Sequence, residues 1–221
     1  MATYVGLDGF RWGWVAVWIE DNEIQGFDYS DSLERLLRYP HTRAMIDMPI
    51  GLPESGQRAC DREAQQLLGP SVFTGVRRDF WTFETQREAN DLYRSKNEPC
   101  ISAQLWSIRS KIREVDDLMS PNRQRTLCET HPELVFWHLN NRTTLLSKKS
   151  EEGRNQRVAI IKKCGIKSIQ RWLSHRWGTG IGSDDVIDAC ACAIAARDAK
   201  RRIPTGKVCL DRKLLRMEMW F

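Results

Sequence analysis

The sequence lacks the features of a membrane or exported protein. No run approaches the roughly 20 apolar residues that a membrane-spanning helix requires. The first residues, MATYVGLDGF, lack the basic and then apolar order of a signal peptide. We therefore expect a cytoplasmic protein without a membrane partner.

Cysteine pairs suited to disulfides or zinc are also absent. The seven cysteines are odd in number and scattered, and no C-x-x-C pair occurs. Cys190 and Cys192 lie in an Ala-rich apolar stretch, where a reduced cysteine acts as a small hydrophobic residue. The sequence predicts neither a disulfide framework nor a zinc site.

Several well-defined catalytic motifs are missing. The chain has no G-x-x-x-x-G-K-[ST] loop, no G-x-S-x-G elbow, no H-E-x-x-H helix and no G-x-G-x-x-G turn after a strand. These absences exclude the enzyme classes that depend on those motifs.

What is present indicates a folded α/β protein. Hydrophobic residues make up 41% of the 221 residues, nine of them tryptophans, which is far from the composition of disordered chains. Apolar and alternating segments predict strands over 4–7, 14–19 and 24–29, a helix over 31–38 and a strand over 43–48. By analogy, this order is typical of the opening of an RNase H-like domain.

The middle of the chain has a different character. Residues 54–125 predict helices and loops, and we interpret them as a helical insertion within a single RNase H-like domain of residues 1–221. A short strand over 126–129 and a helix after Pro132 return the chain to the sheet. A long helix over 184–200, capped by Ser183, ends the pattern.

Two aspartates follow predicted strands. Asp8 ends an apolar strand before Gly9, and Asp47 lies in AMIDMPIGLP, where a proline stops the strand. Asp8 has an alternative role as a turn-forming residue, which is common in Asp-Gly pairs. A partly buried carboxylate at Asp47 needs a cation, hydrogen bonds or protonation.

Two further aspartates share one face of the last helix. Asp185 and Asp188 are three residues apart, so their carboxylates can point to a common position. The helix dipole alone explains an acid at 185, but not the acid at 188, one turn further in. Four carboxylates without histidine or cysteine ligands favour Mg²⁺ or Mn²⁺, and a pair of such ions serves phosphodiester hydrolysis.

The segment CETHPELVF adds two candidates. Glu129 ends the returning strand and is a possible further metal ligand or acid/base group, and His131 is a possible proton carrier. A capping or core role for His131 is an equal alternative.

Positive charge gathers in one segment. Residues 142–177 hold ten Lys or Arg and two acids, a local net charge of +8 in a chain of +5, which leaves −3 elsewhere. Such a segment is either a solvated helix face or a contact for phosphate groups. The candidate phosphate-binding residues are Lys148, Lys149 and Arg157 here, with Arg154 beside them, and Arg77 and Arg78 after a Gly-containing loop.

The motifs together resemble an uncharacterised family of predicted RNase H-like nucleases, domain of unknown function 429. The matching segments are VGLDGFRWGWVAV, IDMPIGLP, RACDREAQQLLG with SVFTGVRR, ISAQLWSIRSKIREVD, ETHPELVFWHL, KKSEEGRNQR and SDDVIDACACAIAA. The last helix is also similar to that of RuvC-type junction resolvases, which implies that Asp185 and Asp188 complete a metal site with Asp8 and Asp47. Val76 departs from the family, whose members often have a proline before the arginine.

The resemblance and the acids predict a metal-dependent nuclease. Two Mg²⁺ or Mn²⁺ ions on Asp8, Asp47, Asp185 and Asp188 would act on DNA or RNA. One alternative is a phosphotransferase or small-nucleotide hydrolase, for which GTGIGSDD is the candidate nucleotide loop. Another is a nucleic-acid-binding protein without turnover.

Overall fold

The computed structural model describes residues 2–20, 24–175, 177 and 180–221. The chain forms two compact units. The first contains Met1–Met48, Thr126–Arg201 and Trp220–Phe221, and the second contains Pro49–Arg125 and Arg202–Met219. The expected insertion of residues 54–125 lies within the second unit, where residues 202–219 accompany it.

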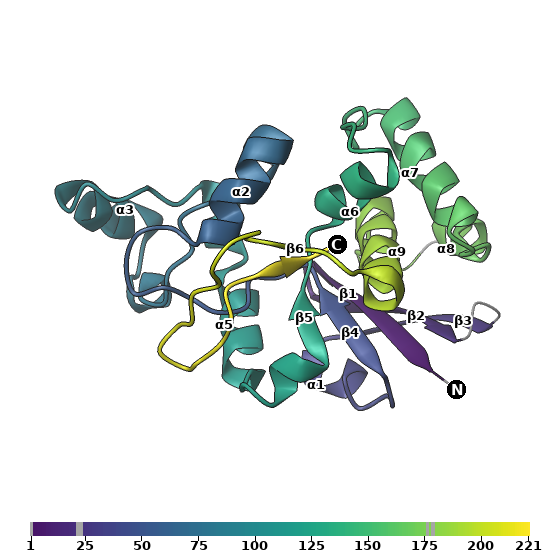
Figure 1. Cartoon of the computed structure of the whole chain (residues 1–221), viewed down its shortest axis with the longest axis horizontal. Coiled ribbons are helices and arrows are strands. Elements are labelled where there is room, and N and C mark those ends of the chain that lie inside the picture. Colours follow the sequence, from purple (N-terminus) through teal and green to yellow (C-terminus); the bar gives the residue numbers. More distant parts are fainter. Residues whose placement is uncertain (1, 21–23, 176, 178–179) are drawn as a thin grey trace. The chain divides into compact units, whose positions relative to one another are not determined.

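A five-stranded mixed sheet forms the centre of the first unit (Figure 1). Its order is β3-β2-β1-β4-β5. β2 is antiparallel to β1 and β3, while β4 is parallel to both β1 and β5. The prediction of an α/β fold is confirmed. The strand bounds are β1 Thr3–Phe10, β2 Gly13–Glu20, β3 Ile24–Ser30, β4 Arg43–Ile46 and β5 Leu127–Glu129.

Helices flank this sheet. The short α1 follows β3, while α6, α7, α8 and α9 come after β5, and Figure 1 shows α9 lying along the sheet with α6, α7 and α8 near it. The basic segment thus forms two helices, with Gly165 at a φ of 98° after the first. The bounds are α1 Leu33–Leu36, α6 Pro132–Leu139, α7 Glu151–Lys163, α8 Ile169–Ser174 and α9 Ser183–Asp198.

Close packing joins α9 to β1. A Cβ atom on Gly6 would lie 2.1 Å from the Ala189 carbonyl oxygen and 2.1 Å from the Ala193 nitrogen, so only glycine permits this approach. The helix begins one residue earlier than predicted. Gly182 is its N-cap, and Ser183 is its first residue rather than its cap.

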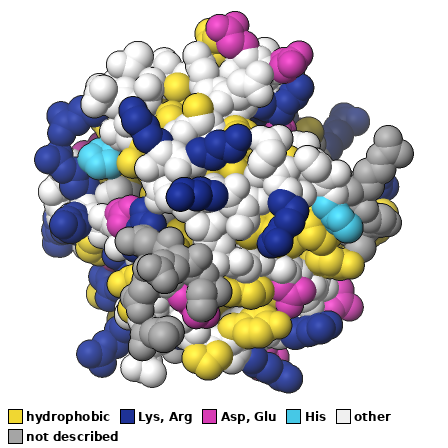
Figure 2. All heavy atoms as spheres, turned by 90° about the vertical axis from the view of Figure 1, so that its right-hand side faces the viewer, with side chains coloured by type: hydrophobic (Ala, Val, Ile, Leu, Met, Phe, Trp, Pro, Cys, Tyr) yellow, Lys and Arg dark blue, Asp and Glu magenta, His cyan; other side chains and the backbone are white. Residues whose placement is uncertain are grey.

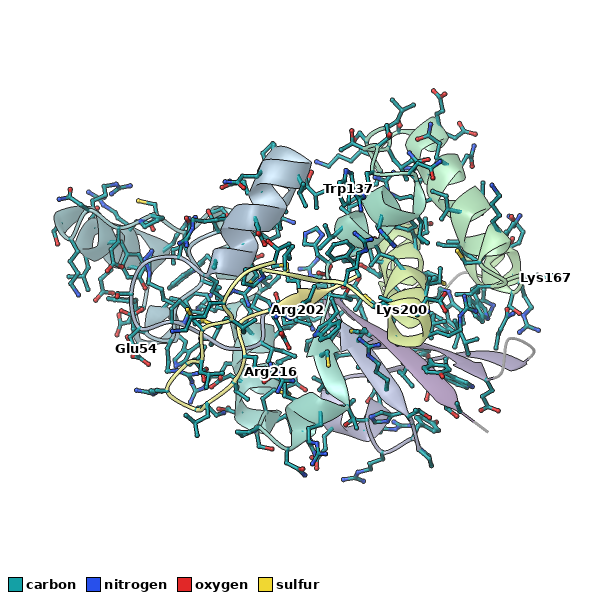
Figure 3. The ribbon with its side chains drawn as sticks, viewed as in Figure 1. Glu54, Trp137, Lys167, Lys200, Arg202 and Arg216 are labelled. Carbon is teal, nitrogen blue, oxygen red and sulfur yellow. The ribbon has the colours of Figure 1, made fainter. Side chains whose placement is uncertain are left out.

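The second unit is mainly helical and contains buried ion pairs. Two of its helices meet at Ile108, and Leu105, Ile112 and Val115 on them are buried. Figure 3 labels Arg202 and Arg216 of its C-terminal segment. Arg216 contacts Glu218 at 2.8 Å, and Arg202 contacts it at 3.5 Å. The helices are α2 Ala59–Leu68, η1 Gly69–Ser71, η2 Phe80–Thr82, α3 Gln86–Ser95, α4 Ala103–Ser107, α5 Arg109–Leu118 and η3 Arg123–Arg125.

Two very short strands, β6 Arg202–Ile203 and β7 Met219–Trp220, pair with each other.

Within the described part of the chain, no helix combines the length and the apolar character that a bilayer crossing requires.

Candidate functional site

The register of two parallel strands brings Asp8 and Asp47 together. Leu7 of β1 pairs with Ile46 of β4, and the Asp47 N–H donates to the Leu7 carbonyl at 3.1 Å. Asp8 and Asp47 directly follow this pair of residues, so they lie side by side on neighbouring segments. Asp8 is buried, and its Oδ1 accepts the Gly9 N–H at 2.8 Å. It pairs with Val15 inside β1, which continues to Phe10, so the alternative role of Asp8 as a turn-forming residue is wrong.

The last helix brings the second pair of aspartates to the same place. Gly6 faces α9, and Asp8 lies two residues further along β1, on the same face of the strand. Asp188 directly precedes Ala189, which contacts Gly6, and it is buried. Asp185 lies in the first turn, where its Oδ2 accepts the Gly182 N–H at 2.7 Å.

Lys148 supplies a cation to this cluster. Its Nζ lies 2.7 Å from Asp188 Oδ2, and its side chain is 39% exposed whereas that of Asp188 is 6% exposed. The other carboxylate oxygen of Asp188, Oδ1, is buried and has no hydrogen-bond partner. The predicted candidate Lys148 thus lies among the carboxylates themselves.

The pKa values show that the carboxylates act on one another. Burial raises the pKa of Asp8 well above its ordinary value, and the charges of Asp47, Asp188 and Asp185 raise it further. Burial also raises the pKa of Asp47 to about 7 and that of Asp188 to about 6, although Lys148 lowers both. The four predicted metal ligands therefore share one electrostatic environment that one lysine does not neutralise.

The donor set suits a hard divalent cation. It consists of carboxylates, one buried oxygen lacks a partner, and negative charge exceeds positive charge. Across residues 2–20, 24–175, 177 and 180–221, however, no three His, Cys, Asp or Glu side chains are grouped so that they could hold a metal ion. The carboxylates fit Mg²⁺ or Mn²⁺ in chemistry, and binding requires them to converge more closely than they do beside Lys148.

The register places Glu129 away from these acids. Ile46 pairs with Glu129 in β4–β5 and with Leu7 in β1–β4, so the three residues lie on the same face of the sheet. Because side chains alternate along a strand, Asp8 points to the opposite face. Glu129 is buried, and this register does not support its predicted role in the same site.

Sequence reasoning missed Glu133, in the first turn of α6. Its carboxylate accepts two hydrogen bonds from Arg157, Nε–Oε1 at 3.0 Å and Nη2–Oε2 at 2.7 Å. Its charge raises the pKa of both Asp47 and Asp188. The signal was the motif ETHPELVF, but an acid in a first helical turn has an ordinary explanation in the helix dipole.

The other predicted basic residues of the first unit differ from one another. Arg157 is buried, whereas Lys149 is exposed and close in sequence to the carboxylate-bound Lys148.

His131 is the N-cap residue of α6, but its side chain does not cap the helix.

Arg77 and Arg78 belong to the second unit and are buried there. Arg77 binds Glu98 at 2.9 Å and the Pro99 carbonyl. Arg78 binds Asp116 at 2.7 Å, and it also pairs with Asp211. Because protein groups already bind the terminal nitrogens of both buried guanidinium groups, the arrangement does not favour the predicted role in holding phosphate.

The fold and the site define a mixed α/β protein with a cluster of carboxylates, two of them buried, near the C-terminal ends of strands β1 and β4. Comparison with family models gives the family: the model described as "Protein of unknown function (DUF429)" matches residues 6–210, and the chain belongs to this family. Searches of curated proteins and of solved structures found no match.

Proposed function

We propose that this protein is a divalent-metal-dependent nuclease with an RNase H-like fold. The observation that carries the proposal is the cluster of Asp8, Asp47, Asp185 and Asp188. They come from three separate segments of the chain, and the charges of the other three raise the pKa of Asp8. Mg²⁺ or Mn²⁺ bound there would polarise a phosphodiester and lower the pKa of an attacking water.

The sheet order supports the fold assignment. Three antiparallel strands are followed by two parallel ones in the order β3-β2-β1-β4-β5, and a helix with two acids packs on the central strand. This is the arrangement that the sequence resemblance implies. Because one fold hosts many reactions, the reaction itself rests on the carboxylates rather than on the fold.

Each residue has a defined task in this proposal. Asp8, Asp47 and Asp188 would hold the cation, and Asp185 would add negative charge from the helix start while binding the Gly182 N–H. The half-exposed ammonium of Lys148 is the cation that an incoming phosphate would meet beside Asp188.

An exposed aromatic residue near the site favours nucleic acid as the substrate. Trp12 is 64% exposed in the turn between β1 and β2, and the Arg11 guanidinium lies 4.6 Å from its ring centroid. β1 ends at Phe10, two residues or roughly 7 Å beyond Asp8. Nucleic-acid bases stack on such rings, and arginine adds a cation for the phosphate backbone.

The helices α7 and α8 provide a further basic surface. Figure 2, which looks from the side where these helices lie in Figure 1, shows several Lys and Arg side chains among uncharged atoms. Lys167 projects outward beside α8 (Figure 3). Exposed lysines and arginines of this kind bind phosphates without sequence preference. The exposed residues are Lys162, Lys163, Lys167 and Arg171.

The test is cleavage of labelled single-stranded, duplex and branched DNA and RNA with Mg²⁺ or Mn²⁺. We expect cleavage by the wild type that EDTA stops, and a loss of at least about 100-fold in Asp8→Asn and in Asp188→Asn, since each removes a charge that holds the ion. Asp117→Asn, a change at an exposed carboxylate of the second unit, is the control. Persistent activity in Asp188→Asn would place the active site elsewhere.

The same assay separates the alternatives. A small-nucleotide hydrolase or phosphotransferase would act on free nucleotides and leave polymers intact. Its candidate loop GTGIGSDD starts at residues 178–179, which lie outside the described residues, and it ends in the first turn of α9. A binding protein without turnover would retain polymers on a filter and cleave none of them.

A further inference from the structure

The backbone before α7 is held by its own side chains. The Leu146 carbonyl accepts from Arg157 Nη1 at 2.8 Å, and the Leu146 N–H donates to Gln156 Oε1 at 3.0 Å. The next residue, Ser147, has a carbonyl that accepts the Ser150 hydroxyl at 2.8 Å and the Ser150 N–H at 3.0 Å. The residues on both sides of position 148 are therefore fixed.

A glycine lets this segment lie against α7. A Cβ atom on Gly153 would be 2.1 Å from the Ser147 carbonyl oxygen and 2.7 Å from that of Leu146, so a larger residue would push the segment away. The Gly153 N–H donates to the Ser150 hydroxyl at 3.0 Å, which caps the helix.

A buried ion pair fixes Arg157, which in turn holds the segment. Arg157 binds the Glu133 carboxylate through two nitrogens, and its Nη1 also donates to the Gly153 carbonyl at 2.8 Å. The residues of the motif KKSEEGRNQR thus share one structural role. Ser150, Gly153, Gln156 and Arg157 position the segment from which Lys148 reaches Asp188.

From this geometry we propose that the Lys148 ammonium is a permanent cation of the carboxylate site and replaces one of two divalent ions. The inference rests on the proposed function and refines it to one metal ion plus one lysine. Lys148 engages Asp188 Oδ2 at 2.7 Å, and Oδ1 of the same carboxylate remains without a hydrogen-bond partner.

An occupied ligand atom and a lowered negative charge explain why Lys148 would exclude a second ion. The ammonium already binds Asp188 Oδ2 at 2.7 Å, and its charge neutralises part of the carboxylate charge that two divalent ions would need. The oxygen Oδ1 stays available for the first ion. An ammonium has three N–H donors, so Lys148 can bind Asp188 and still donate to a phosphate oxygen.

The number of bound ions tests this proposal. Calorimetric titration with Mn²⁺, in the absence of substrate, should give one ion for the wild type and two for Lys148→Met, because the neutral side chain leaves Asp188 Oδ2 free. Lys148→Arg keeps the positive charge and should still bind one ion. Lys149→Met alters the neighbouring exposed lysine and should match the wild type.

The outcomes distinguish this inference from the proposed function. One ion in both the wild type and Lys148→Met would overturn the role of Lys148. Two ions in the wild type would overturn it as well. Neither result would contradict the proposed metal-dependent nuclease. No Mn²⁺ binding by a folded wild type would overturn the proposed function itself. If Lys148→Met melts early, the charge-preserving Lys148→Arg and the neutral Lys148→Gln provide the same comparison.

Discussion

The buried arginines of the second unit and the carboxylate cluster of the first unit differ in how their charges are balanced. In the second unit each buried arginine has carboxylate partners: Arg58 binds Asp61 at 2.5 Å, Arg77 binds Glu98, and Arg78 binds Asp116 and Asp211. In the first unit several acids gather around Lys148, and their pKa values rise. Matched charges indicate a structural role, whereas a surplus of one sign costs stability and indicates a site for a ligand.

Removing a matched charge should have the largest effect on stability. Arg78→Met leaves Asp116 and Asp211 buried without their main cation, and we expect the free energy of unfolding to fall by about 3–5 kcal/mol. Chemical denaturation measures this change. Arg212→Met, at an exposed arginine 3.4 Å from Glu54, should cost less than about 1 kcal/mol. Equal effects at both positions would contradict the distinction between the two kinds of charge.

Local sequence patterns predicted the acids of the first unit better than the partners of either unit. Asp8 lies near the C-terminal end of β1, Asp47 directly follows β4, and Asp185 and Asp188 share a helix face, so the local pattern was enough to single them out. The face of the sheet to which the Glu129 side chain points was not predictable in the same way, since it depends on the strand register.

The ion partners depend on long-range contacts, which explains why they were missed. Arg78 contacts acids 38 and 133 residues away, and Lys148 reaches Asp188 over 40 residues. A pair of basic residues after a glycine gives no local sign of such burial. The arginines of the second unit therefore had the pattern of a phosphate-binding loop, although their partners are carboxylates.

Removing an acid from the carboxylate cluster should change the free energy of unfolding in the opposite direction and stabilise the protein. In metal-free protein at pH 8, Asp47→Asn should raise the free energy of unfolding by about 1–3 kcal/mol, because burial raises the pKa of Asp47 to about 7 and disfavours its charged form. Because the Asp47 side chain is only partly buried, water offsets part of the cost of its charge. Denaturation in EDTA measures it, and Asp117→Asn at an exposed site should leave stability nearly unchanged.

The pH dependence of that stabilisation is the smallest and most specific effect. A carboxyl whose pKa is raised in the folded state binds more protons when folded, so it opposes unfolding at low pH and loses this contribution as pH rises from about 4 to about 7. The difference in stability between Asp47→Asn and the wild type should therefore be near zero at pH 4 and grow by at most about 1 kcal/mol per pH unit up to pH 7. Bound Mn²⁺ should abolish the difference or reverse it, since the ion favours the charged carboxylate that asparagine lacks. A difference that is constant with pH would mean that Asp47 carries no surplus charge, and the contrast between the two units would then be lost at this residue.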